Sequence, residues 1–80
     1  MTREEIITKL TPIVRDVFGN DGLVIDDTMS AETVPEWTSL SFMKLLTEIQ
    51  KQFDFKFNMM EILHLQTMGA VIDAVQKHTV

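Results

Sequence analysis

The chain has 80 residues, 45% of them hydrophobic, and no cysteine, which predicts one domain over residues 1–80 and excludes disulfides, thiolate catalysis and cysteine-ligated zinc. Seven Lys and Arg against twelve Asp and Glu give a net charge of −5, and a chain without clustered basic residues is not expected to bind nucleic acid. Its apolar stretches are far shorter than the roughly 20 residues of a membrane span, and its first residues do not follow the pattern of a signal peptide, so we expect a soluble, cytoplasmic domain with no membrane span.

The first predicted helix begins after Thr2, which has the capping-box spacing to Glu5. Gly19 is expected to end it. Pro12 lies inside this helix and lacks an amide, so we expect either a kink or a second helix start with Thr11 as its cap. The apolar residues at helical spacing are Ile6, Leu10, Ile13 or Val14, and Val17.

Residues 19–37 have no hydrophobic periodicity and are rich in Gly, Asp, Asn, Ser and Pro, which predicts a long loop. Loops above about 12 to 15 residues tend to be functional or disordered. From Asp16 to Glu36 there are six acids and no base, a charge that favours a basic protein partner, although a merely solvated loop would show it too. We expect the loop to be ordered, pinned to the core by Val24, Ile25, Met29 and Trp37.

A second helix is predicted over Ser39–Phe53, with Thr38 or Ser39 as its cap. Phe53 should be buried against the first and last helices, at the end of the apolar stripe. That stripe comprises Phe42, Leu45, Leu46, Ile49 and Phe53. The opposite side places two apolar residues off the core and beside Ser39; it comprises Leu40, Met43, Lys44, Thr47 and Lys51.

Residues 53–57 alternate between apolar and polar, but no second strand is available to pair with them. We therefore expect an extended connector whose phenylalanines fill the core. Asn58 should cap a short helix that ends near Leu63, with Glu61 completing a capping box. Thr67 should cap a last helix. The apolar residues of that helix are Met68, Val71, Ile72 and Val75.

Three kinds of chemistry have weak support in this sequence. His64 and His78 are not accompanied by carboxylates at helical spacing, so we expect surface or boundary histidines and no metal site. The acids of the loop lack the spacing of a calcium loop. A hydrolase built on Ser39, His64 and an aspartate is disfavoured, because a helical chain of this size rarely forms an oxyanion hole in a cleft that excludes water.

Ser39 lies where the acidic loop meets the second helix, within Glu36-Trp37-Thr38-Ser39-Leu40. The free amides and the positive dipole end of a helix N-terminus favour a phosphate at this position. Taken alone, however, a serine before a leucine is more often only a helix cap.

Over residues 4–76 the chain resembles the acyl carrier protein family. The resemblance implies an all-α, four-helix acyl carrier domain, with a long loop between the first two helices and a short third helix, that is not an enzyme. The resembling segments are Trp37-Thr38-Ser39-Leu40, Glu48-Ile49, Phe53-Asp54 and Thr67-Met68-Gly69.

In such carriers the motif serine bears 4'-phosphopantetheine, so the resemblance makes Ser39 the covalent attachment site for a group derived from coenzyme A. It implies a monomer that holds an acyl or aminoacyl group as a thioester. It also implies three kinds of partner: a phosphopantetheinyl transferase, acyl-loading enzymes and acyl-accepting enzymes. The residues expected to bind partners are Thr38, Leu40, Met43, Lys44, Thr47 and Glu48.

Two departures from the family pattern bear on the pathway. Thr38 stands where carriers usually have aspartate, which affects the choice of transferase. Carriers of fatty acid synthesis usually have a strongly acidic second helix, whereas the matching positions here are Ser41, Lys44, Gln50 and Lys51. We therefore expect a dedicated pathway, such as polyketide or specialised lipid synthesis. The alternatives are a housekeeping carrier of fatty acid synthesis and an unmodified helical adaptor.

Overall fold

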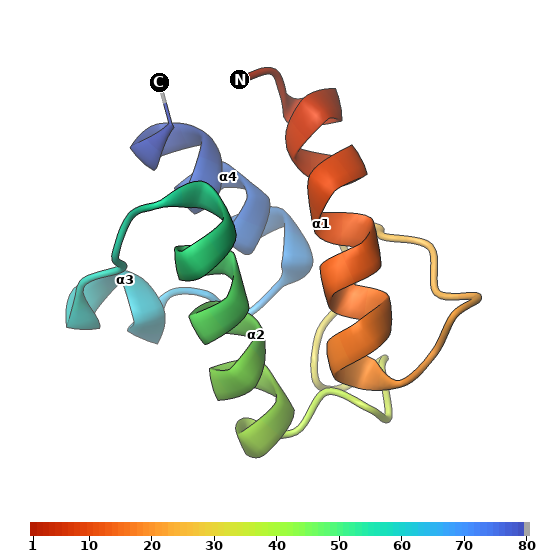
Figure 1. Cartoon of the computed structure of the whole chain (residues 1–80). Helices are drawn as coiled ribbons and strands as arrows, with labels where there is room; N and C mark the ends of the chain where they lie inside the picture. Colours follow the sequence, from red (N-terminus) through yellow and green to blue (C-terminus); the bar gives the residue numbers. More distant parts are fainter. Residues whose placement is uncertain (80) are drawn as a thin grey trace.

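The computed structural model describes residues 1–79 and, within them, four α-helices and no strand. These are α1 (Arg3–Phe18), α2 (Ser39–Phe53), α3 (Met59–Leu63) and α4 (Met68–His78). Helix α1 packs against both α2 and α4, and the short α3 lies at the side of the bundle (Figure 1). The all-α prediction, with a long loop after the first helix, is confirmed. None of the described helices is both long and apolar enough to cross a membrane.

Helix α1 begins with the predicted capping box of Thr2 and Glu5 and ends at Gly19, whose φ of 67° is left-handed. It continues through Pro12, so the predicted restart is wrong. The Thr11 hydroxyl donates to the carbonyl of Ile7 at 2.7 Å, which ties Thr11 into the helix and leaves it no capping role. The buried face is Ile6, Leu10, Val14 and Phe18, while Ile13 and Val17 are half-buried.

The loop between α1 and α2 is pinned to the core mainly by Met29, Val34 and Trp37, which are buried. Ile25 is half-buried, as expected for a pinning residue. The prediction for Val24 is wrong, because 74% of this residue is exposed. Its neighbours on both sides pack against the core, and successive side chains of an extended segment point in opposite directions.

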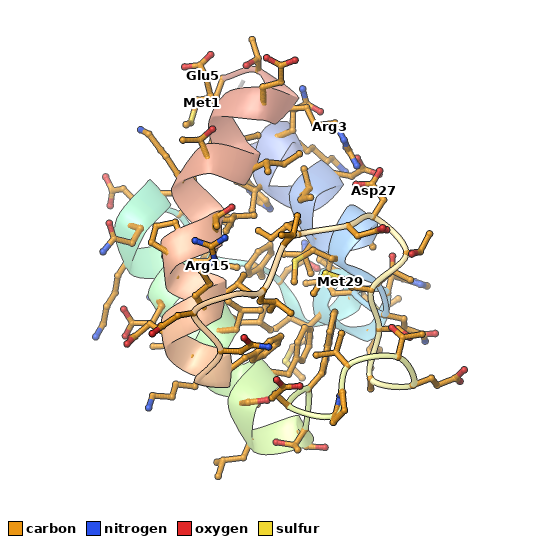
Figure 2. All side chains as sticks on the ribbon, turned by 90° about the vertical axis from the view of Figure 1, so that its right-hand side faces the viewer. Met1, Arg3, Glu5, Arg15, Asp27 and Met29 are labelled. Atoms are coloured by element: carbon orange, nitrogen blue, oxygen red, sulfur yellow. The ribbon has the colours of Figure 1, made fainter. Side chains whose placement is uncertain are left out.

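Helices α1 and α4 hold the middle of the loop in place. Arg3 forms ion pairs with Asp27 of the loop, at 2.6 Å, and with Asp73 of α4. Further along α1, Arg15 Nε donates to the carbonyl of Leu23 at 2.8 Å. Figure 2 shows Arg3 and Arg15 lying along the loop side of α1, with Arg3 reaching toward Asp27.

The loop also forms backbone hydrogen bonds to the first turn of α4. The Met68 amide donates to the Met29 carbonyl at 2.8 Å, and the Gly69 amide donates to the Asp27 carbonyl at 3.1 Å. Residue 69 is buried, and a Cβ there would stand 3.0 Å from the Asp27 carbonyl oxygen. The close approach of loop and helix therefore depends on glycine at this position.

Helix α2 has the predicted bounds and buries Leu45, Leu46 and Ile49. Phe42 and Phe53 at its two ends are only half-buried. The prediction of a fully buried Phe53 is therefore wrong. The reason is that this last helical residue lines an open groove between α1 and α2 and keeps one side toward solvent.

The connector after α2 forms no helix or strand, and it begins at Asp54 in the left-handed conformation. Of its phenylalanines only Phe57 is buried. Phe55 stacks on His78 with ring centroids 4.5 Å apart. His78 Nε2 also lies 2.8 Å from both carboxylate oxygens of Glu61. The backbone amide of Asn58 and the His78 side chain, in that order of effect, lower the pKa of Glu61.

The predicted caps of the last two helices, Asn58 and Thr67, are confirmed. His64 and His78 are both exposed residues, although the side chain of His78, which contacts Glu61, is only 27% exposed. Within residues 1–79, no three His, Cys, Asp or Glu side chains are grouped as a metal site would need.

Candidate functional site

Three hydroxyl side chains lie at the start of α2, and two of them are used to cap it. The Thr38 hydroxyl accepts from the Ser41 amide at 3.2 Å. The Ser41 hydroxyl accepts from the Thr38 amide at 2.8 Å and donates to the Glu36 carbonyl at 2.8 Å. Thr38 is thus the cap. Within residues 1–79 the Ser39 hydroxyl, which is exposed, makes no hydrogen bond, so it is free to react.

The backbone around Ser39 has the electrostatics of an anion-binding helix end. The Ser41 amide is capped by Thr38, and the Phe42 amide donates to the Thr38 carbonyl at 2.9 Å. Among the described residues, the amides of Ser39 and Leu40 have no partner, and no acid lies in the first turn. The positive end of the helix dipole is therefore not compensated by a side chain, which favours a phosphate attached nearby.

The structure places most of the predicted partner-binding residues on the exposed side of α2. Leu40 is 83% exposed and Met43 54%, and Lys44 and Thr47 are exposed further along the helix. The exposed side of α2 is thus apolar beside Ser39, at Leu40 and Met43, and polar or basic further along, at Lys44 and Thr47. Thr38 is exposed as well, although its hydroxyl is committed to the cap.

Glu48 is the predicted partner-binding residue that the structure separates from this surface. It lies on the flank of α2 that faces α1 and lines a groove together with Lys9 and Ile13. Its carboxylate is 3.9 Å from Lys51 Nζ, so the contact between the two charges is loose.

An aromatic cluster that the sequence did not predict lies next to Ser39. Trp37 contacts Phe18 with ring centroids 5.8 Å apart and stacks on Phe42 at 5.6 Å and 17°. Trp37 and Phe42 line an open groove of about 460 Å³. Helical spacing could have found Phe42, since it lies three residues after Ser39 and is therefore its neighbour on the helix surface.

Comparison with known proteins agrees with this geometry. The family model described as phosphopantetheine attachment site matches residues 8–75. The solution structure of a holo acyl carrier protein from Geobacter metallireducens matches with a TM-score of 0.83 and 35% identity, covering 89% of this chain and 82% of that one. No curated protein sequence matches the chain. The chain therefore belongs to the phosphopantetheine-attachment family, as an acyl carrier protein with a covalent 4'-phosphopantetheine group rather than an enzyme.

Proposed function

We propose that Ser39 is the residue that carries the 4'-phosphopantetheine group. The observation that carries this proposal is the unused, exposed hydroxyl of Ser39 between Thr38 and Ser41, whose hydroxyls hold the cap. The remaining nearby serine, Ser30, lies in the loop, and its hydroxyl accepts from the Glu32 amide at 3.3 Å. Among these serines, Ser39 therefore presents its hydroxyl to a transferase at the least cost.

In the attachment reaction the Ser39 hydroxyl oxygen attacks the pantetheine-side phosphorus of coenzyme A. A bond forms between Oγ and phosphorus, the phosphoanhydride bond breaks, and adenosine 3',5'-bisphosphate leaves; the transferase accepts the hydroxyl proton. The amides of Ser39 and Leu40, which have no partner among the described residues, can stabilise the negative charge of the resulting phosphodiester. The group then supplies a terminal thiol that holds an acyl or aminoacyl cargo as a thioester.

The bundle holds Ser39 at a fixed point of its surface, while partner enzymes dock on the exposed side of α2. Leu40 and Met43 supply the apolar centre of this docking surface, and Thr38, Lys44 and Thr47 supply its polar surroundings. Glu48 lies outside this surface, so only a partner that also covers the flank of α2 facing α1 would contact it.

The charge of the docking surface supports a dedicated pathway, such as polyketide or specialised lipid synthesis, over housekeeping fatty acid synthesis. Lys44 lies on it, and Lys51 is exposed further along α2. A partner that recognises carriers through its own Arg and Lys would meet like charge, which reduces its encounter rate and its affinity. Met43→Glu should weaken docking of cognate acyl-loading or acyl-accepting enzymes without changing the melting temperature, because Met43 has no role in the core.

The proposal is tested by the intact mass of the apo protein after incubation with coenzyme A and a broad-specificity phosphopantetheinyl transferase. We expect the wild type and Ser30→Ala to gain one phosphopantetheinyl group and Ser39→Ala to gain none, with all three equally folded by circular dichroism. A wild type that gains no mass would favour the unmodified adaptor. A gain that persists in Ser39→Ala would show that another residue carries the group.

A further inference from the structure

Another groove lies at the end of α2 that is far from Ser39. It is an open groove of about 340 Å³ between the last turns of α2 and the connector that follows, and Figure 1 shows the connector leaving this end of the helix. At 1.5 Å per residue, Ser39 and Lys51 are about 18 Å apart along the helix axis, so the attachment reaction does not use this groove. Its lining is Thr47, Gln50, Lys51, Asp54, Phe55 and Lys56.

This groove continues the docking surface of α2. Thr47 belongs to both, since it is exposed on the docking side of the helix and also lines the groove. Lys51 follows Thr47 by four residues and Lys44 by seven, so the three side chains share one side of α2. All three are exposed. A partner that covers the docking surface can therefore reach the groove without leaving this side of the helix.

The far part of this side is basic, although the chain as a whole is acidic. Lys44, Lys51 and Lys56 are three of the seven Lys and Arg of a chain with a net charge of −5. Among the described residues, Lys44 and Lys56 form no ion pair. Lys51 Nζ is 3.9 Å from the Glu48 carboxylate and 70% of the Lys51 side chain is exposed. The charges of these lysines are therefore available to a partner.

The groove also offers an apolar contact. Phe55 is half-buried: its ring stacks on His78 with centroids 4.5 Å apart, and it also lines the groove. The methylene stems of lysines add apolar surface beside it. Asp54 is the one acid of the lining, and the two lysines of the lining outnumber it, so the groove has a net positive charge.

Building on the docking surface proposed above, we propose that this groove, the lysine groove, receives an acidic segment of the partner enzyme. Carboxylates of that segment lie beside Lys51 and Lys56, and an apolar side chain between them contacts Phe55. Nucleic acid and an anionic membrane fit the groove less well than a protein does. The net charge of −5 repels a polyanion, and two lysines neutralise few of its phosphates.

The lysine groove gives the docking surface an electrical polarity. From Asp16 to Glu36, on the N-terminal side of Ser39, the chain carries six acids and no base. A partner docked on α2 thus meets negative charge at one end of the helix and positive charge at the other. Complementary charge acts mainly on register, encounter rate and the rejection of wrong partners, so this arrangement favours a single docking orientation.

The proposal is tested on the apo protein with two synthetic peptides, observed through its backbone amide resonances. The acidic peptide has a leucine between glutamates, and the basic peptide has lysines in place of the glutamates. At millimolar peptide and low salt, the acidic peptide should shift the amides of Thr47, Lys51, Phe55 and Lys56 about threefold more than the basic one, and less at high salt. Because the test uses the apo protein, its failure leaves the attachment at Ser39 standing, and the intact-mass assay tests that attachment separately.

Matched variants separate the charge of the groove from the charge of the whole chain. Lys51→Glu combined with Lys56→Glu should abolish the preference for the acidic peptide, whereas Lys9→Glu combined with Lys77→Glu, with the same net charge, should retain most of it. Lys9 and Lys77 are exposed on α1 and α4, and Lys77, like Lys51, lies in the last turn of its helix. Circular dichroism checks each fold. Lys51→Gln combined with Lys56→Gln, a milder change, should also remove most of the preference.

Three results would overturn the proposal. The first is the absence of shifts at the groove with the acidic peptide, and the second is an equal loss of the preference in both glutamate pairs. The third is the same set of shifts with inorganic phosphate alone or with phosphatidylglycerol vesicles, because the groove would then be a general anion site or a membrane contact.

Discussion

The replacement of Gly69 by alanine should loosen the packing of the loop between α1 and α2 on α4. The new Cβ would stand 3.0 Å from the Asp27 carbonyl oxygen and 3.2 Å from Asp27 Cβ, and a backbone atom cannot rotate away. Such overpacking costs about 1 to 3 kcal/mol, and the displaced loop also weakens the hydrogen bonds to the Met68 and Gly69 amides, each worth about 1 kcal/mol. The higher helix propensity of alanine relative to glycine offsets at most about 1 kcal/mol of this loss. The net loss of unfolding free energy should therefore lie between about 1 and 4 kcal/mol.

Urea denaturation followed by Trp37 emission measures this loss directly. Gly22→Ala is the matched control, because the nearest atom to its new Cβ is a side-chain oxygen of Asn20 at 3.7 Å, an ordinary contact distance. Its stability should stay within about 0.5 kcal/mol of the wild type. If Gly69→Ala unfolded at the same urea concentration as the wild type, or at a higher one, the close packing of the loop on α4 would not hold.

Three further predictions concern the site and its surroundings. Ser39→Ala should change the stability by less than about 0.5 kcal/mol, whereas Ser41→Ala, which breaks the capping box, should lose about 1 to 2 kcal/mol yet still be modified; thermal melts and intact mass of both variants check this pair. Because the pKa of Glu61 is lowered in the folded state, its contribution is fully present above its ordinary unfolded pKa of about 4.3 and is lost as the pH falls through the lowered value. The difference in melting temperature between wild type and Glu61→Gln should therefore close in strong acid, and a difference that grows as the pH falls would contradict this sign. Converting Lys44 and Lys51 to Glu should speed acyl loading by a fatty-acid-synthesis enzyme, more at low salt than at high salt; equally fast loading of the unaltered protein, with no gain from the change, would refute the dedicated pathway.

The helix starts were predictable from the sequence because capping is local. Thr2, Thr38, Asn58 and Thr67 each accept a hydrogen bond from an amide three residues later. Such a contact depends on one short segment and on no distant part of the chain. The second helix was left with two possible caps, since Thr38 and Ser39 are both suitable residue types. The structure decides for Thr38, because its hydroxyl accepts from the Ser41 amide while Ser39 is already the first residue of the helix.

Burial at the ends of elements was less predictable, because it depends on segments far away in the sequence. Val17 and Phe18 are adjacent, and Phe18 is the buried one because Trp37 returns across the loop to pack against it. Phe53 continues the apolar stripe of its helix, yet nothing in periodicity indicates that the bundle ends there. Periodicity predicts which side of a helix faces the core, but not how far along the helix the core extends.

The candidate site was predicted in part. Leu40 and Met43 are apolar where the helix pattern requires polar residues, so their exposure followed from the sequence. Glu48 lies eight residues after Leu40, which corresponds to a rotation of about 80° around the helix axis. This angle alone could have shown that Glu48 lies to one side of the surface that contains Leu40 and Met43. The groove lined by Trp37, Phe42 and Leu65 could not be predicted, because these residues come together only through the docking of the loop on the bundle.

The central claim is that the group is attached to Ser39, and fragmentation mass spectrometry of the holo protein tests it most directly. Cleavage after Glu36 and Lys44 releases residues 37–44, which contain Ser39 and Ser41, and fragment ions between them distinguish the two. We predict that the phosphopantetheinyl mass is found on Ser39 alone. Its location on Ser41, or on Ser30 in a different peptide, would contradict the account.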